Sequence, residues 1–375
     1  MTSLRLLADD LSGALDTAAE FVGVCGPFEV TWADRTWADG LPSRHPACLA
    51  IDTGTREQSA AQSVAVVERL APMLREGTIA YKKVDSLLRG AWAAELAACL
   101  RVGSWTSCVV APAFAYQGRR TRNGQQYARA ADGSWLPIGD NLLAQLAAAG
   151  LDAQPGRYDA ELTPGIHVFD AESDGDLDRV VALGRRAQQP ILWCGSGGLA
   201  GALARGSDPT APARLRKPVL GLFGSDQPIT AAQLEACGSA VATLAEAGDD
   251  NAVLVRRKLD QDAVALVKFD LATGLSRHEA ARRIAALMGE LTAALTPPGT
   301  LIVAGGETLR ALCLALDARA LKVTGRIVPG LPRSTLQGGR WAGVEVISKS
   351  GAFGAPDLWC TLLRDNQLIH ERSHP

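Results

Sequence analysis

The sequence lacks the features that mark several classes of protein. Its 375 residues carry a net charge of only −2, so charge gives no reason to expect nucleic acid or an anionic membrane as a partner. No apolar run approaches the ~20 residues that span a bilayer. Asp9 and Asp10 interrupt the first apolar run at once, unlike the apolar region of a secretory signal peptide. We therefore expect a cytoplasmic protein with neither a membrane nor a nucleic-acid partner.

Patterns of metal-binding and phosphate-binding residues are also missing. The chain has eight cysteines but no CxxC pair, and its five histidines are scattered. A zinc site needs such residues at close spacing, so the sequence predicts no metal site of this kind. Most cysteines lie in apolar surroundings, which indicates small core residues in a reducing compartment. The pattern GxxxxGK[ST] is absent as well, which excludes a P-loop.

What the sequence does contain is an alternation of short apolar strands with helical segments. This order is typical of mostly parallel sheets flanked by helices, and 375 residues exceed what one core usually holds. The segment 205–217 is rich in proline, alanine and charge and has no periodicity. We predict an α/β fold with two domains, 1–205 and 218–375, joined by a linker over 206–217, with a cleft between them.

Local patterns predict individual elements. After an expected strand that ends at Asp9, we expect a helix over 14–24 that Ser12 caps, with Asp16 in its first turn. The segment 114–140 has no period and is expected to be a long loop. In the second half, we expect a helix over 230–247 and a strand over 252–255.

Charged residues gather at the ends of three expected strands in the first domain. If these strands are neighbours in a parallel sheet, their carboxyl ends face one crevice. The cations there would hold a carboxylate, and an aspartate could take a proton from a hydroxyl. The alternative is a set of structural ion pairs. The candidate residues are Asp10, Arg56, Lys83, Asp85, Ser86 and Arg89, with Asp10 or Asp85 as the catalytic base.

Three glycine turns in the second domain each follow an apolar strand. Glycine permits close approach of the backbone, and a helix N-terminus offers free N–H groups to an anion. Three such turns favour nucleotide binding, and Lys349 beside one of them is either a phosphate contact or a surface lysine. The predicted nucleotide-binding residues are Ser225, Gly305, Gly306, Glu307, Thr308 and Gly351.

A fourth glycine stretch, 195–201, fits the dinucleotide pattern G-x-G-x-x-A. A dinucleotide site also needs an acidic residue ~20 positions further on, at the end of a second strand. That region is the expected linker, so the glycines are better explained by close packing of a helix on a strand. An NAD-dependent dehydrogenase nevertheless stays open as an alternative.

Motifs along nearly the whole chain resemble those of the four-carbon acid sugar kinases, a two-domain family. In the first domain these are LLADDLSGALDTAAEF, YKKVDSLLRGAWAAEL and APAFAYQGRRTRNG, and in the second GSDQPITAAQLEA, GGETLRAL and KSGAFG. The resemblance implies that Asp10, Arg56 and residues 83–86 bind a sugar acid. It implies ATP binding by Ser225, Gly351 and residues 305–308. The stretch after Asn123 departs from the family pattern and leaves the substrate subtype open.

These observations together predict an ATP-dependent kinase that uses Mg²⁺ to phosphorylate the terminal (4-) hydroxyl of a four-carbon sugar acid. Threonate, erythronate and 3-oxo-tetronate are the candidate acids, and Asp10 is slightly favoured over Asp85 as the base. We expect the domains to close around both substrates, with 205–217 as the hinge. A non-catalytic protein that binds a small acid is a further alternative. The oligomeric state is left open, with a homodimer as one outcome.

Overall fold

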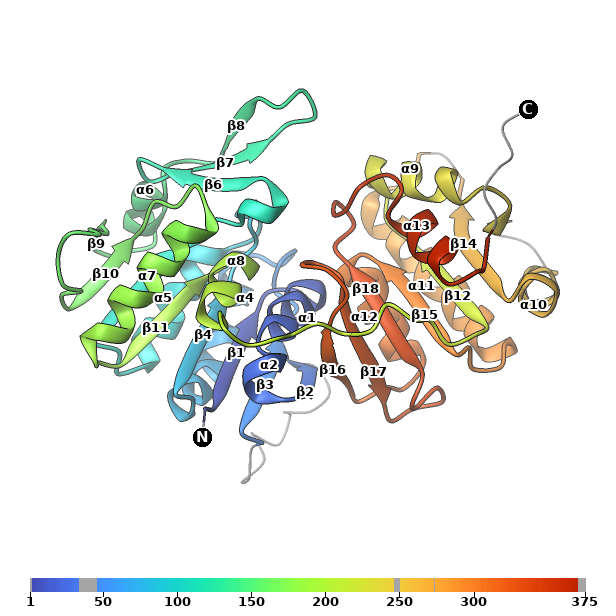
Figure 1. Ribbon diagram of the computed structural model, residues 1–375, viewed down its shortest axis with the longest axis horizontal. Helices are drawn as coiled ribbons and strands as arrows, with labels where there is room; N and C mark the ends of the chain where they lie inside the picture. Colours follow the sequence, from blue (N-terminus) through green and yellow to red (C-terminus); the bar gives the residue numbers. More distant parts are fainter. Residues whose placement is uncertain (1, 34–45, 246–249, 273, 370–375) are drawn as a thin grey trace. The chain divides into compact units, whose positions relative to one another are not determined.

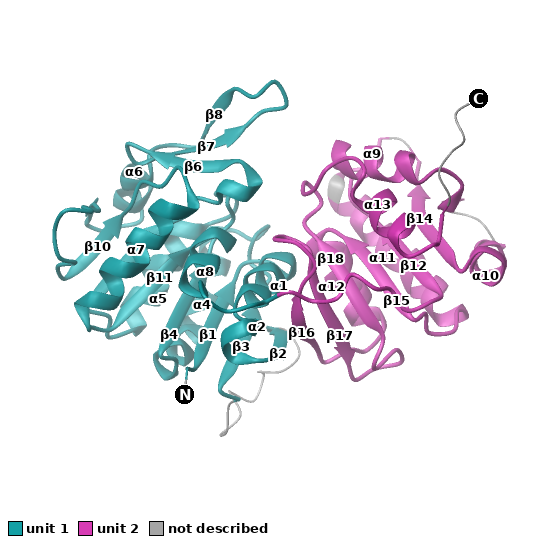
Figure 2. Cartoon of the chain, viewed as in Figure 1, with its two compact units in different colours: residues 1–209 teal, residues 210–375 magenta. Residues whose placement is uncertain are grey.

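The computed structural model describes residues 2–33, 46–245, 250–272 and 274–369. The chain forms two compact units, residues 1–209 and 210–375 (Figure 2). The division falls inside the segment that the sequence marks as a linker. Each unit has its own hydrophobic core, so each is described by itself.

The first unit is built on a parallel sheet with the strand order β2-β3-β1-β4-β11-β5-β10-β9 (Figure 1). Helix α8 contacts α1 and α7, and helix α5 contacts α4 and α6. Side chains alternate between the two faces of a strand, and helices cover both faces. Strands β1, β3 and β5 are therefore buried throughout, and β4 and β11 are buried except at their first residue. The strands span Leu4–Ala8 (β1), Phe28–Trp32 (β2), Cys48–Asp52 (β3), Ile79–Lys83 (β4), Ser107–Ala111 (β5), Ala153–Pro155 (β9), Gly165–Val168 (β10) and Ile191–Gly195 (β11).

The helices of this unit begin mostly at recognisable caps. Helix α1 starts directly after the first strand, because Asp10 is its N-cap and accepts a hydrogen bond from the Gly13 amide at 2.9 Å. The expectation that Ser12 caps a later helix, with Asp16 in its first turn, is therefore wrong. The helices span Leu11–Glu20 (α1), Val22–Cys25 (α2), Ala60–Leu70 (α4), Trp92–Val102 (α5), Leu142–Ala148 (α6), Asp174–Ala187 (α7) and Gly197–Leu203 (α8).

The expected loop over 114–140 is largely a small antiparallel sheet, so that prediction is wrong. Strands β6 (Arg119–Arg122), β7 (Gln125–Arg129) and β8 (Trp135–Ile138) pair in sequence order. Asn123 and Gly124 connect β6 to β7 with φ values of 53° and 70°. Such Asn-Gly pairs favour tight hairpins, but the surrounding arginines hide the strand pattern.

The second unit has the strand order β13-β14-β12-β15-β18-β17-β16. The sheet is parallel from β13 to β18, and β17 and β16 are antiparallel additions. The strands span Val219–Phe223 (β12), Val241–Ala245 (β13), Val264–Asp270 (β14), Thr300–Ala304 (β15), Ala320–Arg326 (β16), Pro332–Gln337 (β17) and Glu345–Lys349 (β18). The helices span Pro228–Cys237 (α9), Asn251–Asp262 (α10), Arg277–Ala294 (α11), Gly306–Ala315 (α12) and Leu358–Asp365 (α13).

Two predictions for the second unit are wrong. The expected helix over 230–247 ends at Cys237, because Gly238 takes a positive φ of 54° and stops it. The expected strand over 252–255 lies inside α10, since its short apolar run continues into a helical sequence. Short apolar runs do not by themselves distinguish a strand from a helix.

Candidate functional site

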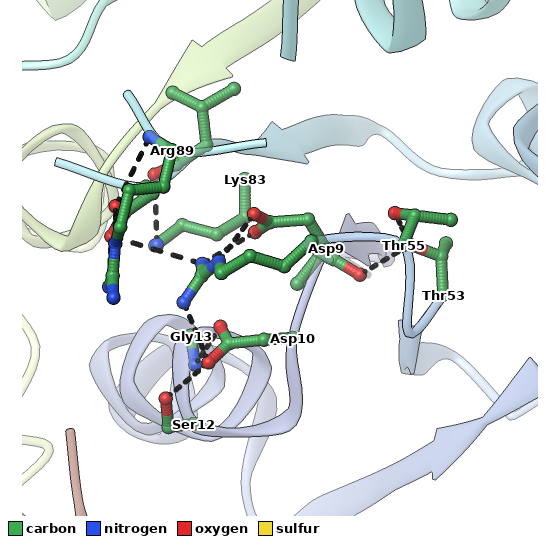
Figure 3. Close-up of polar contacts among 12 residues, drawn as sticks. Asp9, Asp10, Ser12, Gly13, Thr53, Thr55, Lys83 and Arg89 are labelled. Atoms are coloured by element: carbon green, nitrogen blue, oxygen red, sulfur yellow. Dashed lines mark hydrogen bonds and ion pairs between the residues drawn. The ribbon is translucent and has the colours of Figure 1, made fainter. Parts of the chain in front are cut away.

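Three neighbouring strands of the first unit bring its charged residues together. Strands β3 and β4 flank β1, and Ala8 is in register with both Asp52 and Lys83, so the three carboxyl ends are level. The segment after β3 is tied to β1, because the amides of Thr53 and Arg56 donate to the carbonyl oxygens of Ala8 and Asp9 at 2.8 and 3.1 Å. Charged side chains from three strand ends therefore share one edge of the sheet (Figure 3).

Arg56 is the centre of this cluster. Its Nε and Nη2 atoms donate to the two carboxylate oxygens of Asp9 at 2.7 and 2.8 Å. Its Nη1 lies 2.8 Å from Asp10 Oδ2, and its Nη2 lies 3.9 Å from Asp85 Oδ1. The side chain is only 10% exposed. Arg56 thus binds Asp9 in the bidentate manner that suits a guanidinium group, and it forms ion pairs with Asp10 and Asp85.

Asp85 is held from a second side by Arg89. Arg89 Nε and Nη2 donate to its carboxylate oxygens at 2.6 and 3.2 Å. Lys83, which ends β4, donates from Nζ to the carbonyl oxygen of Val84 at 2.9 Å. That is the one hydrogen bond of this ammonium group within the described part of the chain, so two of its donors are available to a ligand.

The cations of the cluster control the charge of its carboxylates. Burial alone would raise the pKa of Asp9, but Arg56, Lys82 and Lys83 outweigh burial and lower it. Burial likewise opposes the shift at Asp85, where Arg56, Arg89 and Lys83 hold the pKa well below its usual range. Asp10 has the most accessible carboxylate of the three, with 15% of its side chain exposed against 5% for Asp9 and 10% for Asp85. Asp10 is therefore the carboxylate best placed to meet a ligand.

Two further contacts involve residues adjacent to the cluster in the sequence. The Lys82 ammonium lies 2.7 Å from Glu95 on α5, and both side chains are buried. The carbonyl oxygen of Ser86 accepts a hydrogen bond from the buried side chain of Gln126 at 2.9 Å. Gln126 belongs to β7, in the segment expected to be a loop, so sequence reasoning missed it. The sequence feature that could have indicated a functional role for this segment is its Gly- and Arg-rich composition.

The glycine turns of the second unit also share one sheet edge, because β12, β15 and β18 are adjacent and parallel. Gly305 is the N-cap of α12 with a φ of 101°, and its amide donates to the carbonyl oxygen of Lys349 at 2.9 Å. A Cβ atom at Gly351 would lie 2.4 Å from Ser225 Oγ. The first turn of α12 contains Gly306, Glu307 and Thr308. This edge therefore offers a helix N-terminus beside close-packed backbone, which suits a phosphate group.

Lys349 is buried, with 1% of its surface exposed, and is not a surface lysine. Its Nζ donates to the carbonyl oxygens of Ser350 and Gly351 at 3.1 and 3.0 Å and to Thr230 Oγ1 at 3.4 Å. These bonds hold the turn at Gly351 against helix α9. Burial lowers the pKa of Lys349 to about 7.

We expect Lys349 to make the free energy of unfolding rise with pH above about 7. The unfolded lysine keeps its proton up to a pKa near 10.5, whereas the folded lysine releases it near 7. Between these values the unfolded state binds more protons, so stability increases with pH. Urea unfolding of the full chain at pH 7, 8 and 9 should show a steeper rise for the wild type than for Lys349→Met. Equal slopes for the two proteins would contradict the assignment.

In the glycine stretch 195–201, neighbouring residues of the chain occupy the space that side chains would need. A Cβ atom at Gly195 would lie 2.5 Å from the carbonyl oxygen of Ala111, and one at Gly198 would lie 2.4 Å from that of Ala113. These glycines let helix α8 pack closely on β5 and the residues that follow it. The turn therefore serves the close packing of a helix on a strand.

The described residues contain no group of three or more His, Cys, Asp or Glu side chains that could hold a metal ion. No helix among them has the length and apolarity to cross a membrane. Asp226 and Glu307 expose single carboxylates at two of the glycine turns. One or two carboxylates together with substrate phosphates are a usual coordination for Mg²⁺.

Each unit contains a segment that matches a known protein domain. Residues 4–147 match a sugar-binding N-terminal domain, and residues 225–359 match a nucleotide-binding C-terminal domain. A D-threonate kinase from Bordetella bronchiseptica is 34% identical to this chain over 98% of each protein. Another, from Cupriavidus necator, is 31% identical over 95% of this chain and 96% of its own.

A solved structure has the same fold. It is a Salmonella typhimurium protein described as a putative tRNA synthase, with a TM-score of 0.75 and 21% identity, and the match covers 97% of this chain and 100% of that one. At this identity the likeness concerns the fold alone. The two matched domains and the identity over almost the full length show that the chain belongs to the four-carbon acid sugar kinase family.

Proposed function

We propose that this chain is an ATP-dependent kinase that phosphorylates the 4-hydroxyl of a four-carbon sugar acid, with D-threonate as the first candidate. The observation that carries the proposal is the cluster of Asp10, Arg56, Lys83 and Asp85 at one sheet edge. This cluster lies inside the segment that matches a sugar-binding domain. A sugar acid needs a cation for its carboxylate and hydrogen-bond acceptors for its hydroxyls, and the cluster supplies both.

In the proposed reaction, Asp10 accepts the proton of the 4-hydroxyl while the hydroxyl oxygen attacks the γ-phosphorus of ATP. The bond from the γ-phosphorus to the bridging oxygen breaks, and ADP leaves. An aspartate has this role in other phosphoryl transfers to a hydroxyl. Asp85 is less suited, because Arg56 and Arg89 lower its pKa and because its side chain is less exposed than that of Asp10, 10% against 15%. Arg56 keeps Asp10 in place.

We assign ATP binding to the glycine turns of the second unit, inside the segment that matches a nucleotide-binding domain. Backbone N–H groups at the start of α12 would donate to phosphate oxygens. Mg²⁺, bound to the phosphates, would neutralise the developing charge, and the Asp226 and Glu307 carboxylates would hold it. The proposed contacts are Ser225, Gly305, Gly306, Glu307, Thr308 and Gly351. The domains in this proposal are 1–205 for the acid and 218–375 for the nucleotide.

A Gly351→Ala variant is expected to bind ADP about 10- to 100-fold more weakly. The added Cβ atom would lie 2.4 Å from Ser225 Oγ and 3.3 Å from Ser225 Cβ, so Ser225 or the turn at Gly351, both proposed nucleotide contacts, must shift. One charge-assisted hydrogen bond to a phosphate accounts for a loss of this size. Gly289→Ala in helix α11 is the matched control, because its Cβ atom would meet only Ala315 at 3.9 Å. Calorimetry with ADP and Mg²⁺ measures both; equal affinities would place the nucleotide elsewhere.

The reaction itself is tested with a panel of acids. The protein is incubated with ATP, Mg²⁺ and D-threonate, D-erythronate or 3-oxo-tetronate, and ADP release is measured. We expect ADP release that depends on the acid, with D-threonate the best substrate and a 4-phosphorylated product by mass spectrometry. Absence of acid-dependent ADP release with all three acids would overturn the proposal. Acid-dependent reduction of NAD in a parallel assay would instead support the dehydrogenase alternative.

A further inference from the structure

The arginines first expected to hold the substrate carboxylate are already engaged. Arg56 uses Nε and Nη2 for Asp9 and Nη1 for Asp10. Arg89 uses the same edge, Nε and Nη2, for Asp85. A carboxylate that bound either guanidinium group through this edge would have to displace an aspartate of the protein.

Arg119, the first residue of β6, has that edge available. Its Nη1 donates to the carbonyl oxygens of Gln117 and Gly118 at 2.7 and 3.0 Å, which fixes the head of the side chain. Its Nε is buried and has no hydrogen-bond partner among the residues that the structure describes. Within the described residues no partner of Nη2 is found either. A buried N–H without a partner destabilises the protein, and a carboxylate would satisfy the Nε and Nη2 edge with two parallel bonds.

The small sheet places Arg119 on the face that packs against the cluster. Arg119 and Thr121 lie two residues apart on β6, so they share a face. Thr121 Oγ1 donates to Gln126 Oε1 at 2.7 Å, and Gln126 Nε2 donates to the carbonyl oxygen of Ser86 at 2.9 Å. This face of the sheet is therefore attached to the turn that contains Asp85 and Ser86.

The other face of β6 has different contacts. Arg120 pairs with Glu172 at 2.8 Å and stacks on Trp135, and Arg122 lies 3.7 Å from Glu172. The alternation along β6 thus separates Arg119 from its two neighbouring arginines. Arg122 offers a matched control, because it has the same side chain three residues away on the opposite face.

Electrostatics agrees with this placement. Burial lowers the pKa of Arg119, Asp85 raises it, and Arg89 lowers it. Asp85 and Arg89 are therefore close enough to affect the pKa of the Arg119 guanidinium group. Lys83, with its spare donors, belongs to the same cluster through its effect on the pKa of Asp85.

We propose that Arg119, together with Lys83, binds the carboxylate of the substrate and so selects sugar acids over neutral four-carbon polyols. The inference rests on the proposed function, because it assumes an acidic substrate in the first unit. The Nε and Nη2 atoms of Arg119 each donate a hydrogen bond to one of the two carboxylate oxygens. The hydroxyl end of the acid is then left to Asp10.

The test compares Arg119→Met and Arg119→Lys with Arg122→Met. Steady-state kinetics gives kcat and the KM values for D-threonate and ATP, and threitol serves as the neutral analogue. Calorimetry gives the Kd of D-threonate independently of turnover. For Arg119→Met we expect the Kd and KM of D-threonate to rise about 10- to 150-fold, as expected for a hydrogen bond to a charged group. The KM for ATP should stay unchanged, and Arg119→Lys should recover part of the loss.

The preference for D-threonate over threitol decides between binding and a structural role. It should fall in Arg119→Met by about the factor lost in affinity, and it should stay unchanged in Arg122→Met. An equal loss for acid and polyol would show a structural role and overturn the inference, as would an unchanged Kd for D-threonate. A wild type that binds D-threonate without turnover would refute the proposed function alone, since the Kd comparison still decides on Arg119. Absence of D-threonate binding to the wild type would overturn both.

Discussion

An Asp10→Asn variant is expected to lose about 10²- to 10⁴-fold in kcat, the usual effect of removing a general base. Asparagine keeps the oxygen that accepts from the Gly13 amide and is as good an N-cap as aspartate, so helix α1 should remain intact. The loss should therefore appear in kcat, while ADP binding and the thermal midpoint stay close to wild type. Turnover of D-threonate and calorimetry with ADP measure these quantities.

Asp85→Asn is the natural comparison. It removes a carboxylate of the same cluster whose oxygens are bound to Arg89, so its kcat should fall much less than that of Asp10→Asn. If Asp85→Asn is inactive and Asp10→Asn is not, the two aspartates have exchanged roles. Normal turnover by both variants would move the acceptor site away from this sheet edge.

Breaking the buried pair behind the site should have the largest effect on stability. Lys82 and Glu95 lie 2.7 Å apart and are both buried. A Glu95→Leu change would leave the ammonium group unpaired in the core, and such changes cost about 3–5 kcal/mol. Urea unfolding of the full chain measures the loss. The double variant Lys82→Met/Glu95→Leu should recover most of it, because no buried charge remains.

An exposed ion pair from the same region provides the control. Arg101 lies 2.9 Å from Glu68, and both side chains are about half exposed. Removing one partner of a pair such as this costs about 0–1 kcal/mol, so Glu68→Gln should stay close to wild type. Similar losses for Glu95→Leu and Glu68→Gln would contradict the view that burial sets the cost.

Much of the first site could be predicted because it depends on where strands end. The apolar runs before Asp9, Thr53 and Val84 define three strands, and parallel pairing brings their ends together. The partners of each side chain could not be predicted in this way. Arg56 and Arg89 were expected to be available to a substrate, yet both pair with aspartates of the chain. Such pairing depends on side-chain distances, which spacing along the sequence does not determine.

The remaining errors arise where local patterns are ambiguous. Arg119 was missed because the Asn123-Gly124 hairpin signal stood among charged residues and the segment was taken as a loop. Lys349 has no local feature that distinguishes a buried lysine from an exposed one, and only its place at the end of a central strand buries it. The antiparallel strands β16 and β17 were not expected either, because few of their residues form continuous apolar runs.

The lack of a side chain at Gly13 determines which residues related chains can have at this position. Glycine inside a helix costs about 1 kcal/mol relative to alanine, yet here it lies in the first turn of α1. A Cβ atom at this position would lie 2.6 Å from Asp10 Oδ1 and 3.0 Å from Lys83 Nζ. A chain of this fold with any other residue there could not hold the aspartate and the lysine as they are held here. Related chains that keep this arrangement of the two side chains should therefore have glycine at this position.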